Sequence, residues 1–297
     1  MVSAQSVCIY FSGLTFRFLF PNPIPLPEDF ADLLCEQCDS PDEEFTIQLL
    51  NKPLRPEGNP IPGRGGAAIY ETEEGWLRIY TPLTAEDGCQ VACLLRSDGK
   101  NLLYYPASRW DYYSSPFHCL HLIAGEALLL RHGAMLLHSS LVMQEGKCVL
   151  FSGPSGAGKS TQARLWQEHL GSQILNGDRC VIRSFDGVIC GGGSPWCGTS
   201  GIRRREHGPI AGIFLVRQAP ENKVTRLGAE AFVPLLTQTT VNSWDKAFME
   251  QVTEMIAELI RRVPIYRLDC TPGPEAVVLA YHTLFHKEYP YETYQKR

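Results

Sequence analysis

The stretch FSGPSGAGKST, residues 151–161, lies near the centre of a chain of 297 residues and decides how the chain is interpreted. Residues 153–160 match the pattern G-x-x-x-x-G-K-[ST] at every position. Glycines at these positions let successive backbone N–H groups converge on phosphate oxygens. A lysine at the position of Lys159 reaches the β- and γ-phosphates, and a hydroxyl at Ser160 can ligate Mg²⁺.

The segments on either side of this loop have the context that the pattern requires. AMLLHSSLVM (134–143) and KCVLFS (147–152) predict two apolar strands joined by a short turn, and TQARLWQEHL (161–170) predicts a helix. The positive end of that helix dipole would point at the same anion. A glycine-rich turn without a ligand is the alternative where such context is missing. The sequence therefore predicts a site for the phosphates of a nucleotide, formed by Gly153, Pro154, Ser155, Gly156, Ala157, Gly158, Lys159, Ser160 and Thr161.

The rest of the chain changes character near residue 120. Before it, SVCIYFSGLTFRFLF (6–20) predicts a strand that ends at a proline-rich segment, and residues 67–83 and 90–106 predict hairpins. After it, HCLHLIAGEALLLRHG (118–133) and DKAFMEQVTEMIAELIRRV (245–263) have helical spacing. A last helix is expected over 274–285, with Pro274 in its first turn. We therefore expect a β-rich domain over 1–119 and an α/β domain over 120–297.

Charge and hydropathy exclude two classes of partner. The formal net charge is −5, and the densest basic run, Arg203 to Arg205, is followed at once by Glu206, so nucleic acid is not expected to bind. The first 13 residues lack the features of a secretory signal. The best membrane candidate, LLLRHGAMLL (128–137), is interrupted by Arg131 and His132. A soluble, cytoplasmic protein without a membrane partner is the expectation.

Eleven cysteines raise the question of a metal. Cys35, Cys38, Cys89 and Cys93 form two close pairs that could supply four thiolates to zinc. The second pair has a three-residue spacer and no glycine flanks the first, so buried free thiols are favoured over a zinc site.

A phosphate loop alone serves switches, motors and kinases, so its surroundings decide the reaction. Many enzymes and switches with this loop hold magnesium through an acid at the end of a second apolar strand. The best such strand here, residues 211–216, ends in Arg217 and Gln218 instead. The nearest candidate acid is Asp178 in ILNGDRCVI (174–182).

LHSSLV (137–142), CVLFSGPSGAGKSTQARLW (148–166) and ILNGDRCVIRSFDG (174–187) resemble the catalytic domain of the HPr serine kinase/phosphorylase family. In that family a His-Gly-x-Leu-Val strand, the phosphate loop and an Asp-Asp-Arg-Val segment follow in this order. GSPWCGT (193–199) and IYRLDC (265–270) look like the divergent members found with modified-peptide pathways. The resemblance covers about the last 170 residues.

The resemblance implies a fold and a set of roles. The fold is an α/β, HPr kinase/phosphoenolpyruvate carboxykinase-like P-loop catalytic domain, preceded here by a smaller β-rich domain. Residues 153–161 would hold ATP, and Ser160 and Asp178 would hold Mg²⁺. Asp178 matches the family's second acid and would accept the proton of the acceptor hydroxyl. His138 matches the strand histidine that faces the site, and Arg179 matches the arginine that would neutralise charge on the transferred phosphoryl group.

The chain departs from the family at two places. The family's first acid is Gly177 here, and residues 199–203 are at best a remnant of the C-terminal Arg-Gly-x-Gly-Ile signature. Both departures favour a kinase over the reverse reaction. Two structural alternatives stay open: Asp178 could cap a turn, because Asn-Gly-Asp is good turn chemistry, and His138 could be a hydrogen-bonded core histidine.

The sequence thus predicts an ATP-dependent kinase that phosphorylates a serine hydroxyl of a peptide or protein, such as a ribosomally made precursor peptide. The β-rich domain could recognise the acceptor by adding a peptide strand to a sheet edge. The alternatives are a small-molecule kinase acting on free serine or another alcohol, and a catalytically degenerate ATP-binding regulatory module. Relatives of this fold often form rings, so a homo-oligomer is a further expectation.

Overall fold

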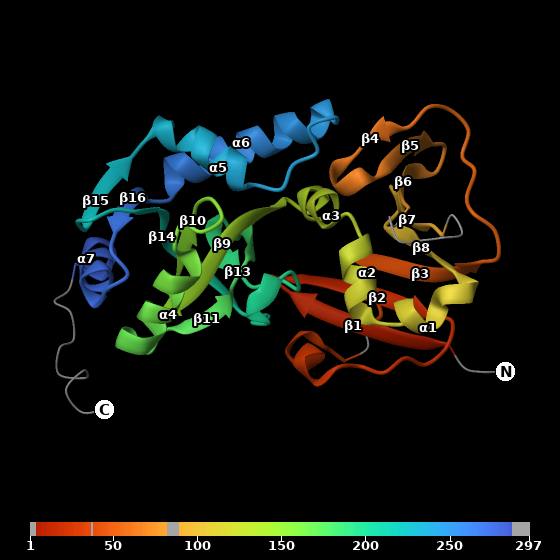
Figure 1. Cartoon of the computed structure of the whole chain (residues 1–297), viewed down its shortest axis with the longest axis horizontal. Helices are drawn as coiled ribbons and strands as arrows, with labels where there is room; N and C mark the ends of the chain where they lie inside the picture. The colour runs from red at the N-terminus through yellow and green to blue at the C-terminus, as the bar shows by residue number, and fades with distance from the viewer. Residues whose placement is uncertain (1–3, 37, 82–88, 287–297) are drawn as a thin grey trace. The chain divides into compact units, whose positions relative to one another are not determined.

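A computed structural model describes residues 4–36, 38–81 and 89–286. The chain divides into two compact units, each described here by itself (Figure 1). Unit 1 consists of Met1–Leu128 and Asn242–Asp245, and unit 2 consists of Leu129–Val241 and Lys246–Arg297. The short segment 242–245 belongs to unit 1 because the ring of Trp244 packs on Trp76, with centroids 4.9 Å apart.

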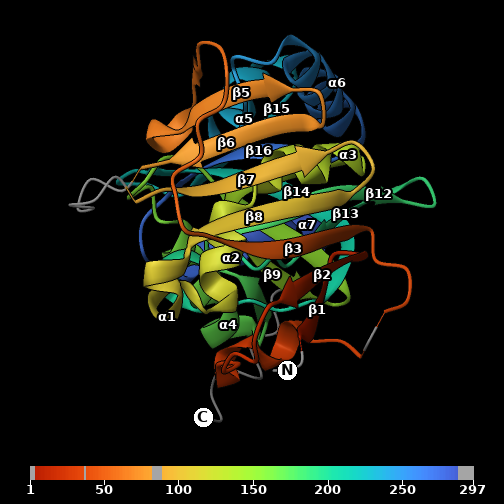
Figure 2. The same cartoon turned by 90° about the vertical axis from the view of Figure 1, so that its right-hand side faces the viewer.

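Unit 1 is built on one eight-stranded sheet within the described residues, in the order β1-β2-β3-β8-β7-β6-β5-β4. Figure 2 looks onto this sheet. Strand β3 pairs in parallel with both β2 and β8, whereas the other neighbours are antiparallel. The strands are β1 (Gln5–Phe11), β2 (Leu14–Phe20), β3 (Glu43–Leu50), β4 (Ile61–Pro62), β5 (Ala68–Thr72), β6 (Gly75–Tyr80), β7 (Val91–Arg96) and β8 (Lys100–Pro106). The hairpins expected over 67–83 and 90–106 are confirmed as β5–β6 and β7–β8.

Two sequence predictions in this part of the chain are wrong in detail. Residues 6–20 were expected to form one strand, but Ser12 (φ 48°) and Gly13 (φ 75°) fold them into the β1–β2 hairpin. Two consecutive positive φ angles match the turn type that suits the twist of paired strands. The single helix expected over 118–133 is also divided, because Ile123 is extended (φ −63°, ψ 144°). The helices here are α1 (Trp110–Tyr113), α2 (Pro116–Leu122) and α3 (Gly125–Arg131).

Unit 2 contains a second eight-stranded sheet among the described residues, in the order β10-β9-β12-β13-β14-β16-β15, with β11 beside β9. Two long strands, β9 and β14, each pair with different partners along their length, and β10 also pairs with β14. The strands are β9 (Ala134–Gln144), β10 (Lys147–Ser152), β11 (Gln173–Asn176), β12 (Arg179–Phe185), β13 (Val188–Gly192), β14 (His207–Gln218), β15 (Lys223–Leu227) and β16 (Ile265–Cys270). The result is a mixed α/β unit, and the described part of the chain has two β-sheets.

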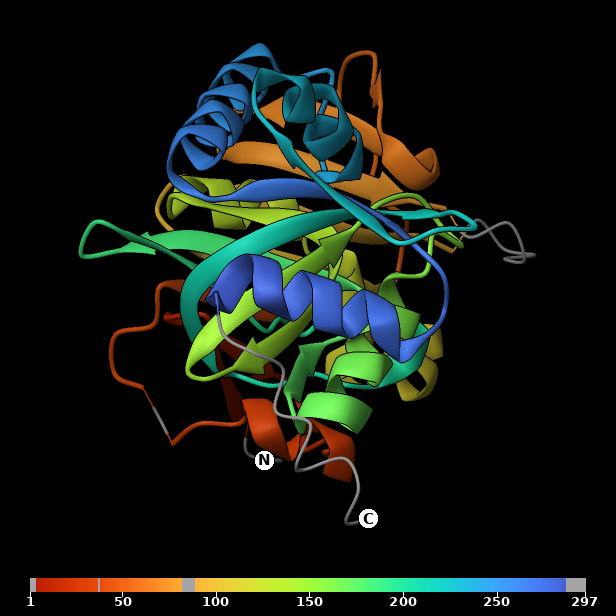
Figure 3. The ribbon, with the colours of Figure 1, turned by 90° about the vertical axis from the view of Figure 1, so that its left-hand side faces the viewer.

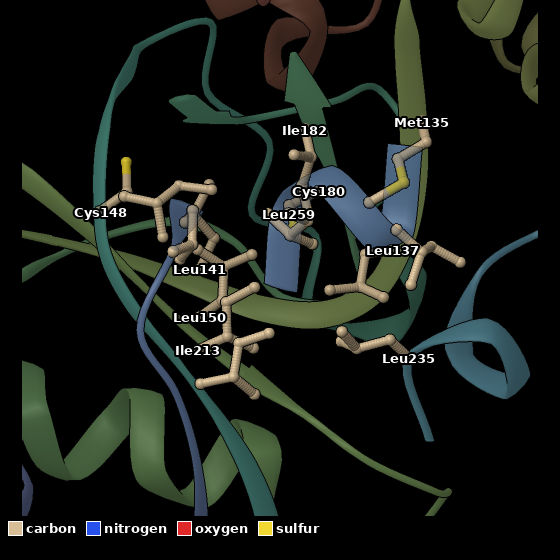
Figure 4. Close-up of a cluster of buried hydrophobic side chains, with 14 of the residues drawn as sticks. Met135, Leu137, Leu141, Cys148, Leu150, Cys180, Ile182, Ile213, Leu235 and Leu259 are labelled. Atoms are coloured by element: carbon tan, nitrogen blue, oxygen red, sulfur yellow. The ribbon is translucent and has the colours of Figure 1, made fainter. Parts of the chain in front are cut away.

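Among the described residues, four helices cover the two faces of the unit 2 sheet. They are α4 (Lys159–Leu170), α5 (Phe232–Gln238), α6 (Lys246–Arg262) and α7 (Pro274–Phe285). Helices α5 and α6 pack on one face, where Leu235 and Leu259 meet side chains of β9, β10, β12 and β14 (Figure 4). Helices α4 and α7 lie on the other face, where Trp166 and Tyr281 pack against Phe151 and Phe214 (Figure 3). The predicted apolar stripe of α6 is confirmed: Phe248, Val252, Ile256 and Leu259 are buried.

Strand direction determines where a ligand can bind in unit 2. Strands β10, β14 and β16 run parallel to one another, so their carboxyl ends lie at the same edge of the sheet. Ligands of open α/β sheets bind outside such carboxyl ends, where loops rather than neighbouring strands follow. The glycine-rich loop, residues 153–158, follows β10 at this edge.

The core of unit 2 gives a first testable prediction. Leu150 lies in β10 and is fully buried, so Leu150→Ala should lower the free energy of unfolding by about 2–5 kcal/mol through lost burial and a cavity. Val233→Ala, at a side chain that is 66% exposed, should change it by less than about 0.5 kcal/mol. Denaturant titration of both variants measures the difference. Equal stability of the two variants would contradict the packing described here.

None of the eleven cysteines, all of which lie in the described residues, forms a disulfide. Burial raises the pKa of the Cys93 thiol to about 12, so it stays protonated at neutral pH. No cluster of three or more His, Cys, Asp or Glu side chains placed to hold a metal occurs among the residues described. Within the same residues, no helix is both long and apolar enough to cross a membrane.

Candidate functional site

The loop between β10 and α4 has the backbone of a phosphate cradle. Gly153 (φ 144°), Gly156 (φ 79°) and Gly158 (φ 106°) all adopt positive φ angles that other residues rarely accept. A Cβ atom on Gly153 would lie 3.0 Å from the carbonyl oxygen of Val216 in β14, so the loop also approaches the neighbouring strand closely. Helix α4 begins at Lys159, directly after Gly158, and points its N-terminus at the loop.

Lys159 folds back onto this loop. Its Nζ donates hydrogen bonds to the carbonyl oxygens of Gly153 (3.0 Å) and Pro154 (3.1 Å), and the residue is only 7% exposed. Burial lowers the pKa of Lys159, and the nearby charge of Asp178 opposes that shift. The positive group is thus held on the loop, beside the N-terminus of α4, which fits the phosphates of a nucleotide.

Asp178 lies in the turn between β11 and β12. The turn is made by Asn176, whose Oδ1 accepts the N–H groups of Asp178 (2.9 Å) and Arg179 (2.8 Å). The backbone of Asp178 is tied further by the N–H of Ser139, which donates to its carbonyl oxygen (2.9 Å). The side chain that stabilises this turn is therefore that of Asn176, and not that of Asp178 as the sequence alternative proposed. The Asp178 carboxylate contacts other residues.

The Asp178 carboxylate contacts the side chains of His138 and Arg179. His138 Nε2 lies 3.2 Å from Asp178 Oδ1, and Arg179 Nε lies 3.5 Å from Asp178 Oδ2. The hydrogen bond from His138 lowers the pKa of Asp178, and the charges of His138, Arg179 and Lys159 lower it further against the effect of burial. Asp178 is therefore an ionised hydrogen-bond acceptor at neutral pH.

A cavity of about 500 Å³ brings the predicted residues together. Its wall contains His138, Lys159, Ser160 and Asp178, all from unit 2. Arg179 is not among the residues that line this cavity, and its Nη1 donates to Thr240 Oγ1 (3.4 Å). The lining residues are His138, Ser140, Ser155, Gly156, Lys159, Ser160, Ala163, Arg164, Ile174, Gly177, Asp178, Thr199, Ser200 and Ile202.

The sequence patterns did not indicate that the turn Gly198–Ser200 contributes to the wall of this cavity. A Cβ atom on Gly198 would lie 2.9 Å from both Cβ and Cγ of Asp178, so the turn packs directly on that side chain. On Gly177, a Cβ atom would overlap the side chain of Ser200. Ser200 thus occupies the space that a side chain at position 177 would need. Arg164, one turn into α4, is the second lining residue without a signal in the sequence pattern.

Gly198 provides a prediction with a matched control. Gly198→Ala should displace Asp178 and reduce activity, whereas Gly201→Ala should reduce activity little because nothing lies within 4 Å of its added Cβ. Both glycines have positive φ angles, 56° and 68°, so both variants should lose about 1 kcal/mol of stability from the backbone alone. The phosphoryl transfer that the sequence predicts, measured beside thermal unfolding, separates the two effects. Equal activity of both variants would show that the turn does not hold Asp178.

A second cavity of about 430 Å³ lies on the other side of the loop. It is formed at the carboxyl ends of β14 and β16 and by the first turn of α4, and its wall is richer in apolar groups. Gln218, directly after the apolar part of β14, donates from Nε2 to the carbonyl oxygen of Gly156 (2.7 Å) and joins this wall to the loop. The lining residues are Ala157, Gly158, Thr161, Gln162, Gln218, Ala219, Cys270, Thr271 and Pro272.

No family model matches the chain, and no curated protein matches it. Among solved structures, the chain is similar to the HPr(Ser) kinase/phosphatase from Coxiella burnetii, at 11% sequence identity and a TM-score of 0.29. The match covers 55% of this chain and 99% of that protein. This distant and partial likeness does not assign a function.

Proposed function

We propose that the protein is an ATP-dependent kinase that transfers the γ-phosphate to a serine hydroxyl of a peptide or protein. The observation that carries the proposal is that the Asp178 carboxylate, the Lys159 ammonium and the Ser160 hydroxyl line one cavity at the mouth of the glycine-rich loop. Phosphoryl transfer needs a cation at the phosphates and a hydrogen-bond acceptor that orients the attacking hydroxyl. Lys159 would supply the cation, and the Asp178 carboxylate would accept the hydrogen bond.

The two parts of the nucleotide, the triphosphate and the nucleoside, would occupy different cavities. The triphosphate would lie along the loop, with its γ-phosphate in the cavity of Asp178. The nucleoside would lie in the second cavity, beside Thr161 and Ala219. Volumes of about 500 and 430 Å³ are in the range of small-molecule sites. Ser160 and Asp178 would hold Mg²⁺, which would neutralise phosphate charge.

The acid–base chemistry agrees with a loose transition state. A carboxylate with a lowered pKa is a weak base, but such a transition state needs an aligned hydroxyl more than a strong base. His138 orients Asp178 through its Nε2 and keeps one carboxylate oxygen engaged. The other oxygen faces Arg179, whose charge stabilises the ionised form.

The rim of the first cavity favours a large acceptor over a free amino acid. Arg164, Thr199 and Ser200 all line the cavity and are exposed, so the cavity reaches the surface of unit 2. A small-molecule kinase would be expected to enclose its acceptor in a closed polar pocket. An open rim fits a serine side chain that a longer chain presents. Recognition of that chain by unit 1 stays a prediction, as does a homo-oligomer.

One experiment tests the proposal. The full chain is incubated with Mg²⁺ and ATP labelled in the γ-phosphate, in parallel with a library of serine-containing peptides, with free serine and with no acceptor. We expect label in the peptides and far less in free serine. Label in free serine alone would favour the small-molecule kinase. Tight ATP binding without transfer to any acceptor would favour the regulatory module and overturn the kinase.

A further inference from the structure

We propose that Thr199 is a site of intramolecular phosphorylation: when no acceptor is bound, the chain transfers the γ-phosphate of ATP to the hydroxyl of its own Thr199. This inference rests on the proposed kinase function and adds a modification site to it. Two observations support this site: the hydroxyl groups that line the cavity of Asp178, and the position of the turn that carries one of them.

Three hydroxyl groups outside the proposed phosphate-binding residues 153–161 line this cavity, those of Ser140, Thr199 and Ser200. Ser140 Oγ donates to the carbonyl oxygen of Gly177 (3.1 Å), and Ser200 Oγ donates to the carbonyl oxygen of Cys197 (2.6 Å). Thr199 is exposed, and within the described part of the chain its hydroxyl has no hydrogen-bond partner. Thr199 is therefore the hydroxyl that can turn toward a phosphate without breaking a hydrogen bond.

The turn that carries Thr199 lies on the catalytic carboxylate. The preceding residue, Gly198, approaches Asp178 so closely that a Cβ atom would be 2.9 Å from its carboxyl carbon. The following residue, Ser200, fills the space beside Gly177. Thr199 is thus held between two contacts with the Asp178 turn. A hydroxyl fixed in the same cavity as the donor reacts as if at very high concentration, because no bimolecular encounter is needed.

The step balances without a further reactant. A bond forms between Thr199 Oγ1 and the γ-phosphorus of ATP, the bond from that phosphorus to the β–γ bridging oxygen breaks, and ADP leaves. The Oγ1 proton passes to the Asp178 carboxylate and from there to water. The phosphothreonine would carry about −1.5 to −2 charge at neutral pH. Lys159 and Arg164, which line the same cavity, provide two cations to stabilise that charge.

The test uses the full chain with Mg²⁺ and γ-labelled ATP and no peptide, followed by mass-spectrometric mapping of the phosphate. We expect one phosphate on Thr199, formed at a rate per molecule that does not change with protein concentration. Thr199→Val should abolish it and Thr199→Ser should retain it. Thr237→Val is the matched control, because Thr237 is exposed on α5, outside the cavity. Thr199→Val breaks no hydrogen bond in the described chain, so this variant should fold. Mapping the phosphate on the unaltered protein tests the proposal without any variant.

Each other outcome overturns the inference. Phosphate on a different residue, or a rate that rises with protein concentration, would exclude intramolecular transfer to Thr199. Label in the serine peptide library with none on Thr199 would overturn this inference and leave the proposed kinase intact. Label in neither peptide nor protein, with ATP still bound, would overturn the kinase and the modification site together.

Discussion

Lys159→Met is expected to reduce phosphoryl transfer by at least about 10³-fold, the loss typical of removing a cation that stabilises transferring phosphate. Methionine keeps most of the length and the apolar part of the side chain but removes the ammonium group. In the described part of the chain the Lys159 Nζ donates two hydrogen bonds, to the carbonyl oxygens of Gly153 and Pro154, so the fold should be retained without them. Steady-state transfer to the serine peptide library, together with ATP binding by calorimetry, measures the effect.

Lys147→Met is the matched control for this prediction. Lys147 begins β10, the same strand that leads into the loop, but its side chain is exposed and outside both cavities. Its loss should leave transfer within about twofold of the unaltered protein, as for surface substitutions in general. Transfer by Lys159→Met at the level of this control would show that the loop does not hold the transferred phosphate.

The parts of unit 2 that local sequence patterns specify were predicted well. The strand, glycine loop and helix around residue 153 are local features, because the loop pattern and the apolar strand before it are contiguous in the sequence. The segments 134–143, 245–263 and 274–285 also appear where their periodicity placed them, as β9, α6 and α7. Asp178, His138 and Lys159 came from the same short segments, and the structure brings them into one cavity.

The remainder depends on contacts between distant residues, which a single sequence does not reveal. The turn Gly198–Ser200 reaches Asp178 only because β12 and β13 form a hairpin that returns the chain to that point. Nothing in the pattern of Arg164 indicates that it faces the cavity. The second cavity similarly combines residues after β14 and β16, which become neighbours only through parallel pairing. Arg179 was predicted to neutralise charge on the transferred phosphoryl group; its guanidinium contacts Thr240 and Asp178, and that role stays a prediction.

The contact between Gly177 and Ser200 bears on the direction of the reaction. Any side chain at position 177 would overlap Ser200, whose hydroxyl is fixed by the carbonyl oxygen of Cys197. Glycine at position 177 is therefore matched by the packing around it. Asp178 is the one acid that lines this cavity among the described residues. One weakly basic carboxylate suits forward transfer from ATP, in which the hydroxyl needs orientation.

Asp178→Asn is expected to lower the rate constant of transfer by about 10²–10⁴-fold, the range for a positioned acid–base group. Asparagine keeps the shape of the side chain but removes the charge that accepts the proton of the acceptor hydroxyl. ATP binding should change much less, because the lysine and the loop backbone hold the phosphates. Since the pKa of Asp178 lies below its ordinary value of 3.8, the loss should be equal at about pH 6 and about pH 8.

Asp186→Asn separates this effect from a general loss of one acid. Asp186 is exposed in the β12–β13 turn at φ 47°, a backbone conformation that asparagine accepts, so this control should fold and transfer phosphate normally. Single-turnover transfer with saturating ATP, beside equilibrium ATP binding, distinguishes chemistry from affinity. If Asp178→Asn loses affinity for ATP as strongly as it loses rate, Asp178 contributes to nucleotide binding alone, and the proton must leave the acceptor by another route.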